Sequence, residues 1–121
     1  MKRYKADALL GTSRYKIAIT EKQLESQVKD LAKLFHWKYY HTWRSFHSPA
    51  GFPDCVMVKQ SRIIFAELKS EKGKISPKQQ EWLDAIGDVG DKDVQVYLWR
   101  PSDFENIAEV LREDNISTTN G

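Results

Sequence analysis

Cysteine is almost missing from this chain, since Cys55 is the only one among its 121 residues. An intrachain disulfide is therefore impossible, which agrees with a reducing cytoplasm. No apolar run approaches membrane-spanning length, and the basic N-terminus is not followed by a hydrophobic signal core. The net charge is only +2, so the overall charge balance does not identify a partner.

Length and residue patterns predict one α/β domain. Apolar residues make up 40% of the chain, enough for a single modest core. Capping boxes mark three helix starts: Thr20 with Gln23, Ser76 with Gln79 and Ser102 with Glu105. Strand patterns occupy residues 37–43, 55–58, 63–66 and 94–99. The order α-β-β-β-α-β-α predicts a mixed sheet flanked by helices in residues 20–114. A basic, aromatic arm (1–19) precedes this domain, and a polar tail (115–121) follows it.

The segment from Gly51 to Lys69 carries the candidate site. Two apolar strands flank a polar turn at residues 59–61, which predicts a hairpin. The hairpin brings Asp54, before the first strand, beside Glu67, near the end of the second. Side chains alternate along a strand, so Glu67 and Lys69 point to the same face. Such charges cost several kcal/mol in a buried sheet unless something pairs them.

Two carboxylates and an ammonium group at a strand end suit a divalent metal ion. Mg²⁺ takes oxygen ligands and keeps several waters when one or two carboxylates bind it. Asp54 and Glu67 are the candidate ligands, with the backbone carbonyl of Leu68 as a third. Lys69 would orient or deprotonate a water molecule, or neutralise a phosphate. The alternative is a purely structural Glu67–Lys69 pair, with Asp54 ending a turn.

These motifs together resemble a known nuclease family. The Pro-Asp pair followed by Glu-x-Lys resembles the PD-(D/E)XK nuclease superfamily. Within it, the stretches 51–54, 65–69 and 76–83 resemble the virus-type replication-repair nuclease (VRR-NUC) domain in its stand-alone, phage-like form. The resemblance runs from about Thr20 to Leu111 and implies a restriction-endonuclease-like core.

The resemblance also implies an activity and further site residues. It implies a Mg²⁺- or Mn²⁺-dependent endonuclease that cuts branched DNA such as four-way junctions. The sequence does not indicate whether a helicase or replication partner directs it. An active-site glutamate on the first helix corresponds to Glu25, which would reach a second ion or its water shell, and Glu21 is the competitor one turn earlier. Gln79 would reach the site from the second helix. Its capping position explains it equally well.

The chain also contains candidates for contacts with DNA. His41, Arg44 and Ser45 precede the Gly-Phe-Pro-Asp turn, and Lys72 and Lys74 lie in the loop after Lys69. Basic side chains supply most of the non-specific affinity for nucleic acid. Five aromatic residues exceed what so small a core readily buries, which favours a homodimer interface: Trp37, Tyr39, Trp43, Trp82 and Trp99. A two-fold dimer would supply the two cuts that a four-way junction requires.

Two other functions compete with this hypothesis. One is a DNA-binding or assembly protein whose nuclease fold no longer cuts, against which the complete set of acids and lysine argues. The other is a sequence-specific restriction-type nuclease, which is disfavoured because so short a chain has little room for base-reading insertions.

Overall fold

The computed structural model describes residues 18–43 and 47–114. The elements follow one another as α1 (Glu21–Leu34), β1 (Lys38–His41), β2 (Cys55–Lys59), β3 (Arg62–Leu68), α2 (Pro77–Gly87), β4 (Val94–Trp99), the short 3₁₀ turn η2 (Pro101–Asp103) and α3 (Phe104–Arg112). This order confirms the predicted α/β class. Residues 1–17 of the predicted arm and the predicted tail lie outside the described residues.

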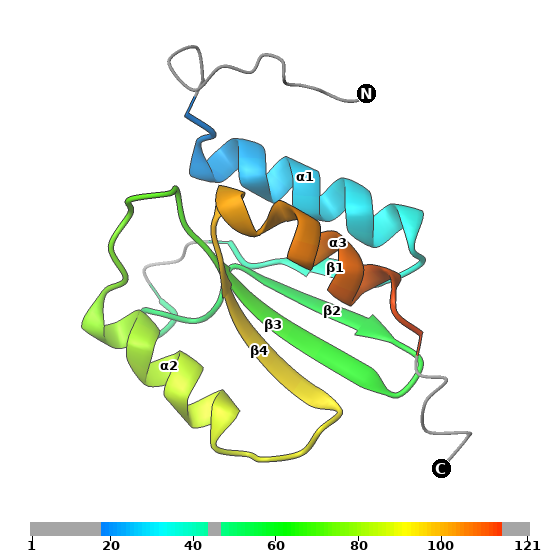
Figure 1. Ribbon diagram of the computed structural model, residues 1–121. Coiled ribbons are helices and arrows are strands. Elements are labelled where there is room, and N and C mark those ends of the chain that lie inside the picture. Colours follow the sequence, from blue (N-terminus) through cyan, green and yellow to red (C-terminus); the bar gives the residue numbers. More distant parts are fainter. Residues whose placement is uncertain (1–17, 44–46, 115–121) are drawn as a thin grey trace.

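One mixed sheet, in the order β1-β2-β3-β4, forms the centre of the molecule (Figure 1). The pairs β1–β2 and β2–β3 are antiparallel, and a two-residue turn joins β2 to β3, whereas β3 and β4 are parallel. A parallel pair needs a long crossover, and α2 supplies it. No helix in the described part of the chain is both long and apolar enough to span a membrane.

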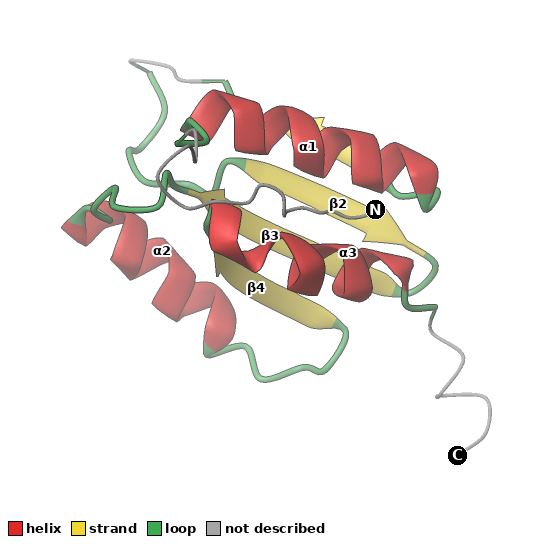
Figure 2. Ribbon diagram, turned by 45° about the horizontal axis from the view of Figure 1, so that its top comes forward, coloured by secondary structure: helices red, strands yellow, loops and turns green. Residues whose placement is uncertain are grey.

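The main core lies on the sheet face that α1 and α3 cover (Figure 2). Alternate strand residues such as Met57, Ile64 and Trp99 meet Leu24 of α1 and Ile107 of α3, and each is almost fully buried. The opposite face is covered more thinly. There α2 packs mainly against β4, whose residues on this face remain half-buried. Glu67 belongs to this second face, because Ala66 and Leu68 occupy the core face.

Two of the three predicted capping boxes are present. Thr20 and Gln23 exchange both bonds at the start of α1, and Ser76 and Gln79 do so at α2. The third prediction is wrong, because Ser102 lies within η2 and α3 begins at Phe104. The backbone N–H and hydroxyl group of Ser102 instead donate to the Glu71 carboxylate, at 3.0 and 2.8 Å. Glu71, which is distant in the sequence, therefore accepts from Ser102 in place of the predicted partner Glu105.

The aromatic residues do not form the surface surplus that would favour a dimer. Trp37 and Trp99 belong to the core, with 5% and 1% of their surface exposed, and Tyr39 packs against it. The Trp37 indole also donates to the Leu111 carbonyl oxygen at 2.7 Å. Trp82 of α2 packs edge to face against Phe52. Trp43 alone of the five is largely exposed, so this argument for a homodimer was wrong.

Candidate active site

The β2–β3 hairpin brings Asp54 and Glu67 together, as its register requires. Cys55 pairs with Ala66, so the next position outward places Asp54 opposite Glu67. The Asp54 carboxylate accepts a 2.8 Å hydrogen bond from the backbone N–H of Leu68. Asp54 is therefore held against the end of β3 rather than simply ending a turn.

Glu67 is buried but incompletely paired. One of its oxygens, Oε2, accepts a 2.9 Å hydrogen bond from the Gln79 amide and lies 3.8 Å from the Lys69 ammonium group. The other, Oε1, is buried without a donor. Gln79 thus caps α2 and contacts Glu67 with the same side chain, since its Oε1 accepts from the Ser76 N–H. The side chains of Glu67 and Lys69 are 1% and 14% exposed.

This environment favours the protonated form of Glu67. Burial and, after it, the negative charge of Asp54 raise the pKa of its carboxyl group to about 8, although the positive charge of Lys69 acts in the opposite direction. In the absence of a cation, the two acids therefore do not readily hold two negative charges.

The oxygen donors at this point fit a hard divalent cation. Within residues 18–43 and 47–114, no three His, Cys, Asp or Glu side chains are grouped to hold a metal ion. The carboxylates of Asp54 and Glu67 are the two candidate ligands, and the unpartnered Oε1 of Glu67 is available to bind a cation. Mg²⁺ is commonly held by one or two carboxylates and several waters, so two are sufficient.

Cys55, beside this pair, takes no part in the chemistry. Burial raises the pKa of its thiol to about 12, and the neighbouring Asp54 charge adds to the effect. A neutral thiol is a weak nucleophile and a poor metal ligand. Cys55 is fully buried and acts as a packing residue on the core face.

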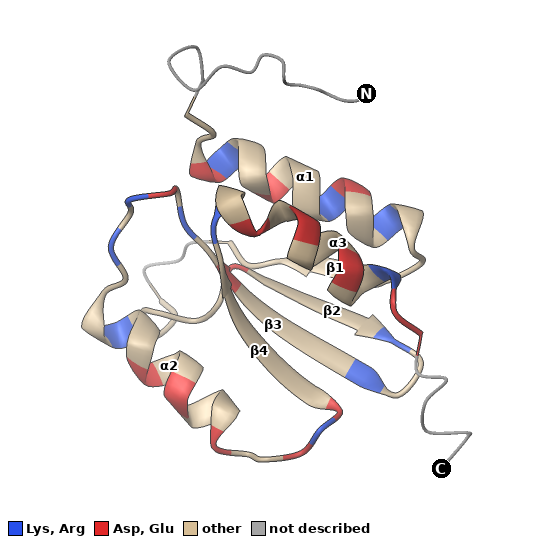
Figure 3. Ribbon diagram, in the orientation of Figure 1, with Lys and Arg blue, Asp and Glu red and all other residues tan. Residues whose placement is uncertain are grey.

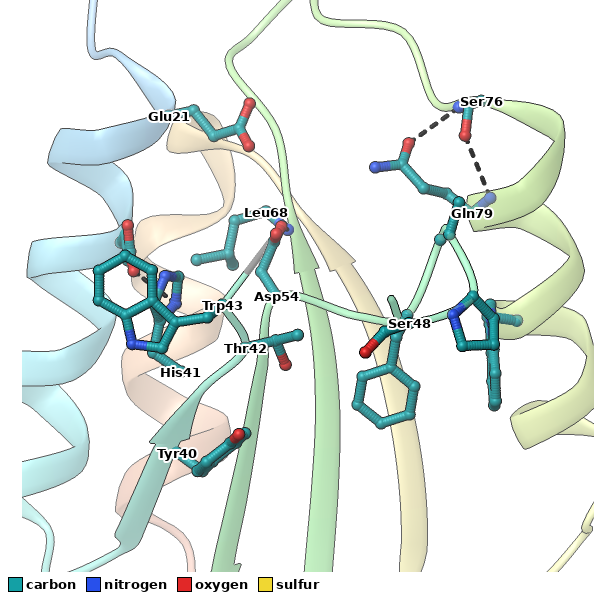
Figure 4. Close-up of a pocket in the computed structure, with 16 residues that line it drawn as sticks. Glu21, Tyr40, His41, Thr42, Trp43, Ser48, Asp54, Leu68, Ser76 and Gln79 are labelled. Carbon is teal, nitrogen blue, oxygen red and sulfur yellow. Dashed lines mark hydrogen bonds and ion pairs between the residues drawn. The ribbon is translucent and has the colours of Figure 1, made fainter. Parts of the chain in front are cut away.

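A cleft of about 1070 Å³ opens over Asp54 and Leu68. One wall comes from α1 and the end of β1, and the other from the loop through Gly51 and the start of α2 (Figure 4). Its described lining contains three acids and no lysine or arginine: Glu21, Glu25 and Asp54. A phosphate group entering it would meet negative charge unless cations came with it.

Both glutamates of α1 line the cleft, but their contacts differ. Glu25 Oε2 lies 2.5 Å from His41 Nδ1, so the predicted DNA contact His41 is instead paired with a carboxylate. Glu21 is exposed, and its charge contributes to raising the Glu67 pKa. The geometry therefore keeps both glutamates as candidates for the helix carboxylate.

The glycine of the Gly-Phe-Pro-Asp turn has an unusual backbone angle. Gly51 has a φ of +98°, in the region that favours glycine. A Cβ atom at this position would lie 2.5 Å from the backbone carbonyl oxygen of Lys78 in α2. The loop and the helix therefore touch backbone to backbone on this wall of the cleft.

The predicted DNA-binding lysines lie away from the cleft lining. Lys72 and Lys74 are exposed in the loop between β3 and α2 (Figure 3), and neither lines the cleft. Arg44 and Ser45 fall outside the described residues. The structure thus brings together Asp54, Glu67, Lys69 and Gln79, places Glu25 and His41 in the wall, and leaves the two lysines at the periphery.

The basic loop is held by a residue that the sequence analysis did not single out. Nη1 of Arg100 donates to the carbonyl oxygens of Ser70, Glu71 and Gly73, at 2.8, 3.1 and 2.7 Å. The Lys69 N–H also donates to the Trp99 carbonyl oxygen at 3.0 Å, which extends the β3–β4 ladder. Arg100 therefore anchors the segment that joins Lys69 to the helix of Gln79. No local motif signals contacts across 27 to 30 residues of sequence.

Replacing Arg100 with alanine is expected to lower the free energy of unfolding by roughly 1.5–3 kcal/mol, because three carbonyl groups lose a charged donor. The midpoint of urea denaturation measures this change. Arg112→Ala is the matched control, since within the described part of the chain the Arg112 side chain makes only an exposed 3.9 Å contact with Glu109, and such pairs contribute little. Equal midpoints for the two variants would show that the loop does not depend on Arg100.

Comparison with known proteins identifies the family. The model of the VRR-NUC domain family matches residues 13–100. A solved structure described as a VRR_NUC domain protein superposes with a TM-score of 0.60 at 16% identity. The match covers 84% of this chain and 91% of that one. No curated protein matches the chain significantly. The family match spans the α1 wall, the Asp54–Glu67 pair and α2, and the chain therefore belongs to the VRR-NUC family, whose domain implies a nuclease of the PD-(D/E)XK type.

Proposed function

We propose that this protein is a divalent-metal-dependent endonuclease that hydrolyses phosphodiester bonds in DNA. The observation that carries the proposal is that the half-buried Asp54, which lines an acidic cleft, lies beside the buried Glu67 at the end of the β2–β3 hairpin. Glu67 keeps one oxygen without a donor. A pair of acids held so closely costs stability in the absence of a cation, and a bound cation would offset that cost.

Each site residue has a role that follows from its contacts. Asp54 and Glu67 would hold Mg²⁺ or Mn²⁺, with the Leu68 carbonyl as a third donor. When bound, the ion would lower the pKa of a water molecule and stabilise the charge that develops on the phosphate. Lys69, 3.8 Å from Glu67, would orient and activate water on the same face of the sheet. Gln79 would fix the orientation of the Glu67 carboxylate beside Asp54 through its hydrogen bond to Oε2.

The helix carboxylate completes the site in this proposal. Glu25 would act on a second ion or its water shell, and His41 orients it through the 2.5 Å contact. Glu21 is the alternative, because its charge already acts on Glu67. Comparing Glu25→Gln with Glu21→Gln in one cleavage assay identifies the residue, since only the loss of the helix carboxylate should lower the rate.

Phosphate contacts would come from outside the cleft floor. Lys72 and Lys74 stand on the anchored loop next to Lys69, and Arg44 and Ser45 follow β1 in the sequence. We place His41 among the DNA-facing residues as well, because it lines the cleft. Exposed lysines bind phosphates by releasing counterions, so the affinity for DNA would fall steeply with salt.

The substrate would be branched DNA, with the four-way junction as the leading candidate. One small site cuts one strand, whereas resolving a junction takes two matched cuts, which a two-fold homodimer would supply. Sedimentation of the protein with and without junction DNA tests the dimer. A monomer both with and without junction DNA would contradict the dimer. The protein would then cut one strand at a time, and the chemistry assigned to Asp54 and Glu67 would be unchanged.

The test of the proposed function is cleavage of a panel of labelled DNAs: a duplex, a single strand, a flap and a four-way junction. Cleavage is expected with added Mg²⁺ or Mn²⁺ and is expected to stop when EDTA removes the ion, because nothing then lowers the pKa of the attacking water or stabilises the charge that develops on the phosphate. Resolution of the products on a denaturing gel gives the rate and the position of each cut. Cleavage that persists in EDTA, or that never occurs with either metal, would overturn the proposal.

A further inference from the structure

Trp43 is exposed in a way that packing does not explain. Six large hydrophobic residues are exposed in the described part of the chain, and Trp43 is the most exposed of them, at 80%. Of the six, only Trp43 and Tyr40 line the cleft. Burial of an indole is strongly favourable, and Trp37 and Trp99 are buried in the core. An indole left in water at the wall of a nuclease cleft therefore suggests a contact with substrate.

A short series of contacts holds Trp43 at this position. The Trp43 and His41 rings meet edge to face, with centroids 6.2 Å apart and an interplanar angle of 67°. His41 is in turn held by Glu25 of α1. Figure 4 shows His41 and Trp43 together on the α1 side of the cleft, with Asp54 between them and Ser48 of the opposite loop. Neighbours cover only a fifth of the indole, so it remains available as a flat platform.

The composition of this wall suits a base better than a phosphate. The described lining of the cleft combines aromatic side chains with acids, and it has neither lysine nor arginine. Aromatic side chains bind nucleobases by stacking, whereas phosphates are bound by cations. A base inside a continuous duplex is already stacked on its neighbours. Only a base that has left the stack, in a single strand or at a branch point, can reach a protein ring without a large cost.

Resting on the proposed nuclease function, we infer that Trp43 stacks on an unstacked nucleobase next to the scissile phosphate. The site therefore selects DNA with an unpaired or branch-point nucleotide over continuous duplex. Tyr40, 62% exposed, also lines the cleft, but it points to the opposite face of β1 from His41 and is no part of this platform. Recognition of this kind depends on DNA structure and not on base sequence, because every base has a flat face.

Equilibrium binding tests the inference without relying on cleavage. Fluorescence anisotropy in EDTA gives the affinity for a labelled flap DNA and for a continuous duplex of the same length. Trp43→Ala is expected to weaken flap binding about fivefold to a hundredfold and duplex binding less than about twofold. Trp43→Phe keeps a ring and should restore most of the flap affinity. Leu34→Ala is the control, because Leu34 is 63% exposed and does not line the cleft.

A second measurement applies even if Trp43→Ala folds poorly. Stacking on a base quenches indole fluorescence, so unlabelled flap DNA should quench the parent protein and quench Trp43→Phe much less. Equal quenching of both, or equal loss of flap and duplex affinity in Trp43→Ala, would overturn the base-binding role. If both Trp43 effects appear but no DNA is cut with any metal, the nuclease proposal fails and the base-binding role stands.

Discussion

A glutamine in place of Glu67 is expected to lower the rate of DNA cleavage by about three orders of magnitude, since metal-ion catalysis supplies several kcal/mol. The fold should survive the change. The oxygen of a glutamine can still accept from Gln79, and its amide group takes the place of the unpartnered Oε1, so the hydrogen bond to Gln79 persists without the charge. Single-turnover cleavage with saturating Mg²⁺ and circular dichroism measure the two effects.

The matched control for this substitution is Glu109→Gln. The Glu109 side chain lies on α3, is 72% exposed, and has among the described residues only a 3.9 Å contact with Arg112, so the loss of its charge should change neither cleavage nor stability. Undiminished cleavage by Glu67→Gln would show that the carboxylate does not hold the ion. A large loss of stability in the same variant would show that the carboxylate is structural.

The metal-free protein is expected to lose stability as the pH rises toward 8, and Glu67 should account for much of that loss. Its pKa is about 8 in the folded state against an ordinary value of 4.5. Between these values the folded protein holds a proton that the unfolded chain has released. The contribution of Glu67 to the free energy of unfolding is therefore fully present below pH 4.5 and is lost as the pH rises through about 8. A single group changes stability by at most about 1.4 kcal/mol per pH unit.

Urea denaturation in EDTA at several pH values measures this loss, and Glu67→Gln serves as the reference. The difference in free energy of unfolding between variant and parent should widen in favour of the variant as the pH rises. Added Mg²⁺ should restore the parent near pH 8, because a metal binds the ionised carboxylate and only the folded state presents the pair. Parallel pH profiles for the two proteins would contradict the raised pKa of Glu67.

The parts of the site that the sequence predicted are those that depend on short-range geometry. A tight hairpin determines its own register, so the meeting of Asp54 and Glu67 followed from the turn and the alternation of side chains. The cap at Ser76 and Gln79 was equally local. The expectation that Gln79 reaches the site came from the family resemblance, whereas its 2.9 Å hydrogen bond to Glu67 was not predicted.

The parts that the sequence did not predict depend on contacts between distant segments. The Arg100 anchor joins the end of β4 to a loop that precedes it by a whole crossover. Ser102 has a suitable local partner in Glu105, yet Glu71 takes that role from across the fold. The pairing of Glu25 with His41 likewise depends on how α1 lies against β1. Periodicity and capping rules consider only residues close in the sequence, so they do not predict when a residue from a distant segment takes the place of a local partner.

The close approach of Gly51 to Lys78 has a consequence for how the cleft can be redesigned. The two backbones are already in contact, and a mutation can shorten a side chain but not the backbone, so the loop and the helix cannot come closer. Substitutions on that wall can therefore change the residues that line the cleft, but they cannot bring α2 nearer to the loop. Variants meant to accept thicker or thinner nucleic acid should be sought on the α1 side, where side chains such as Trp43 determine the opening.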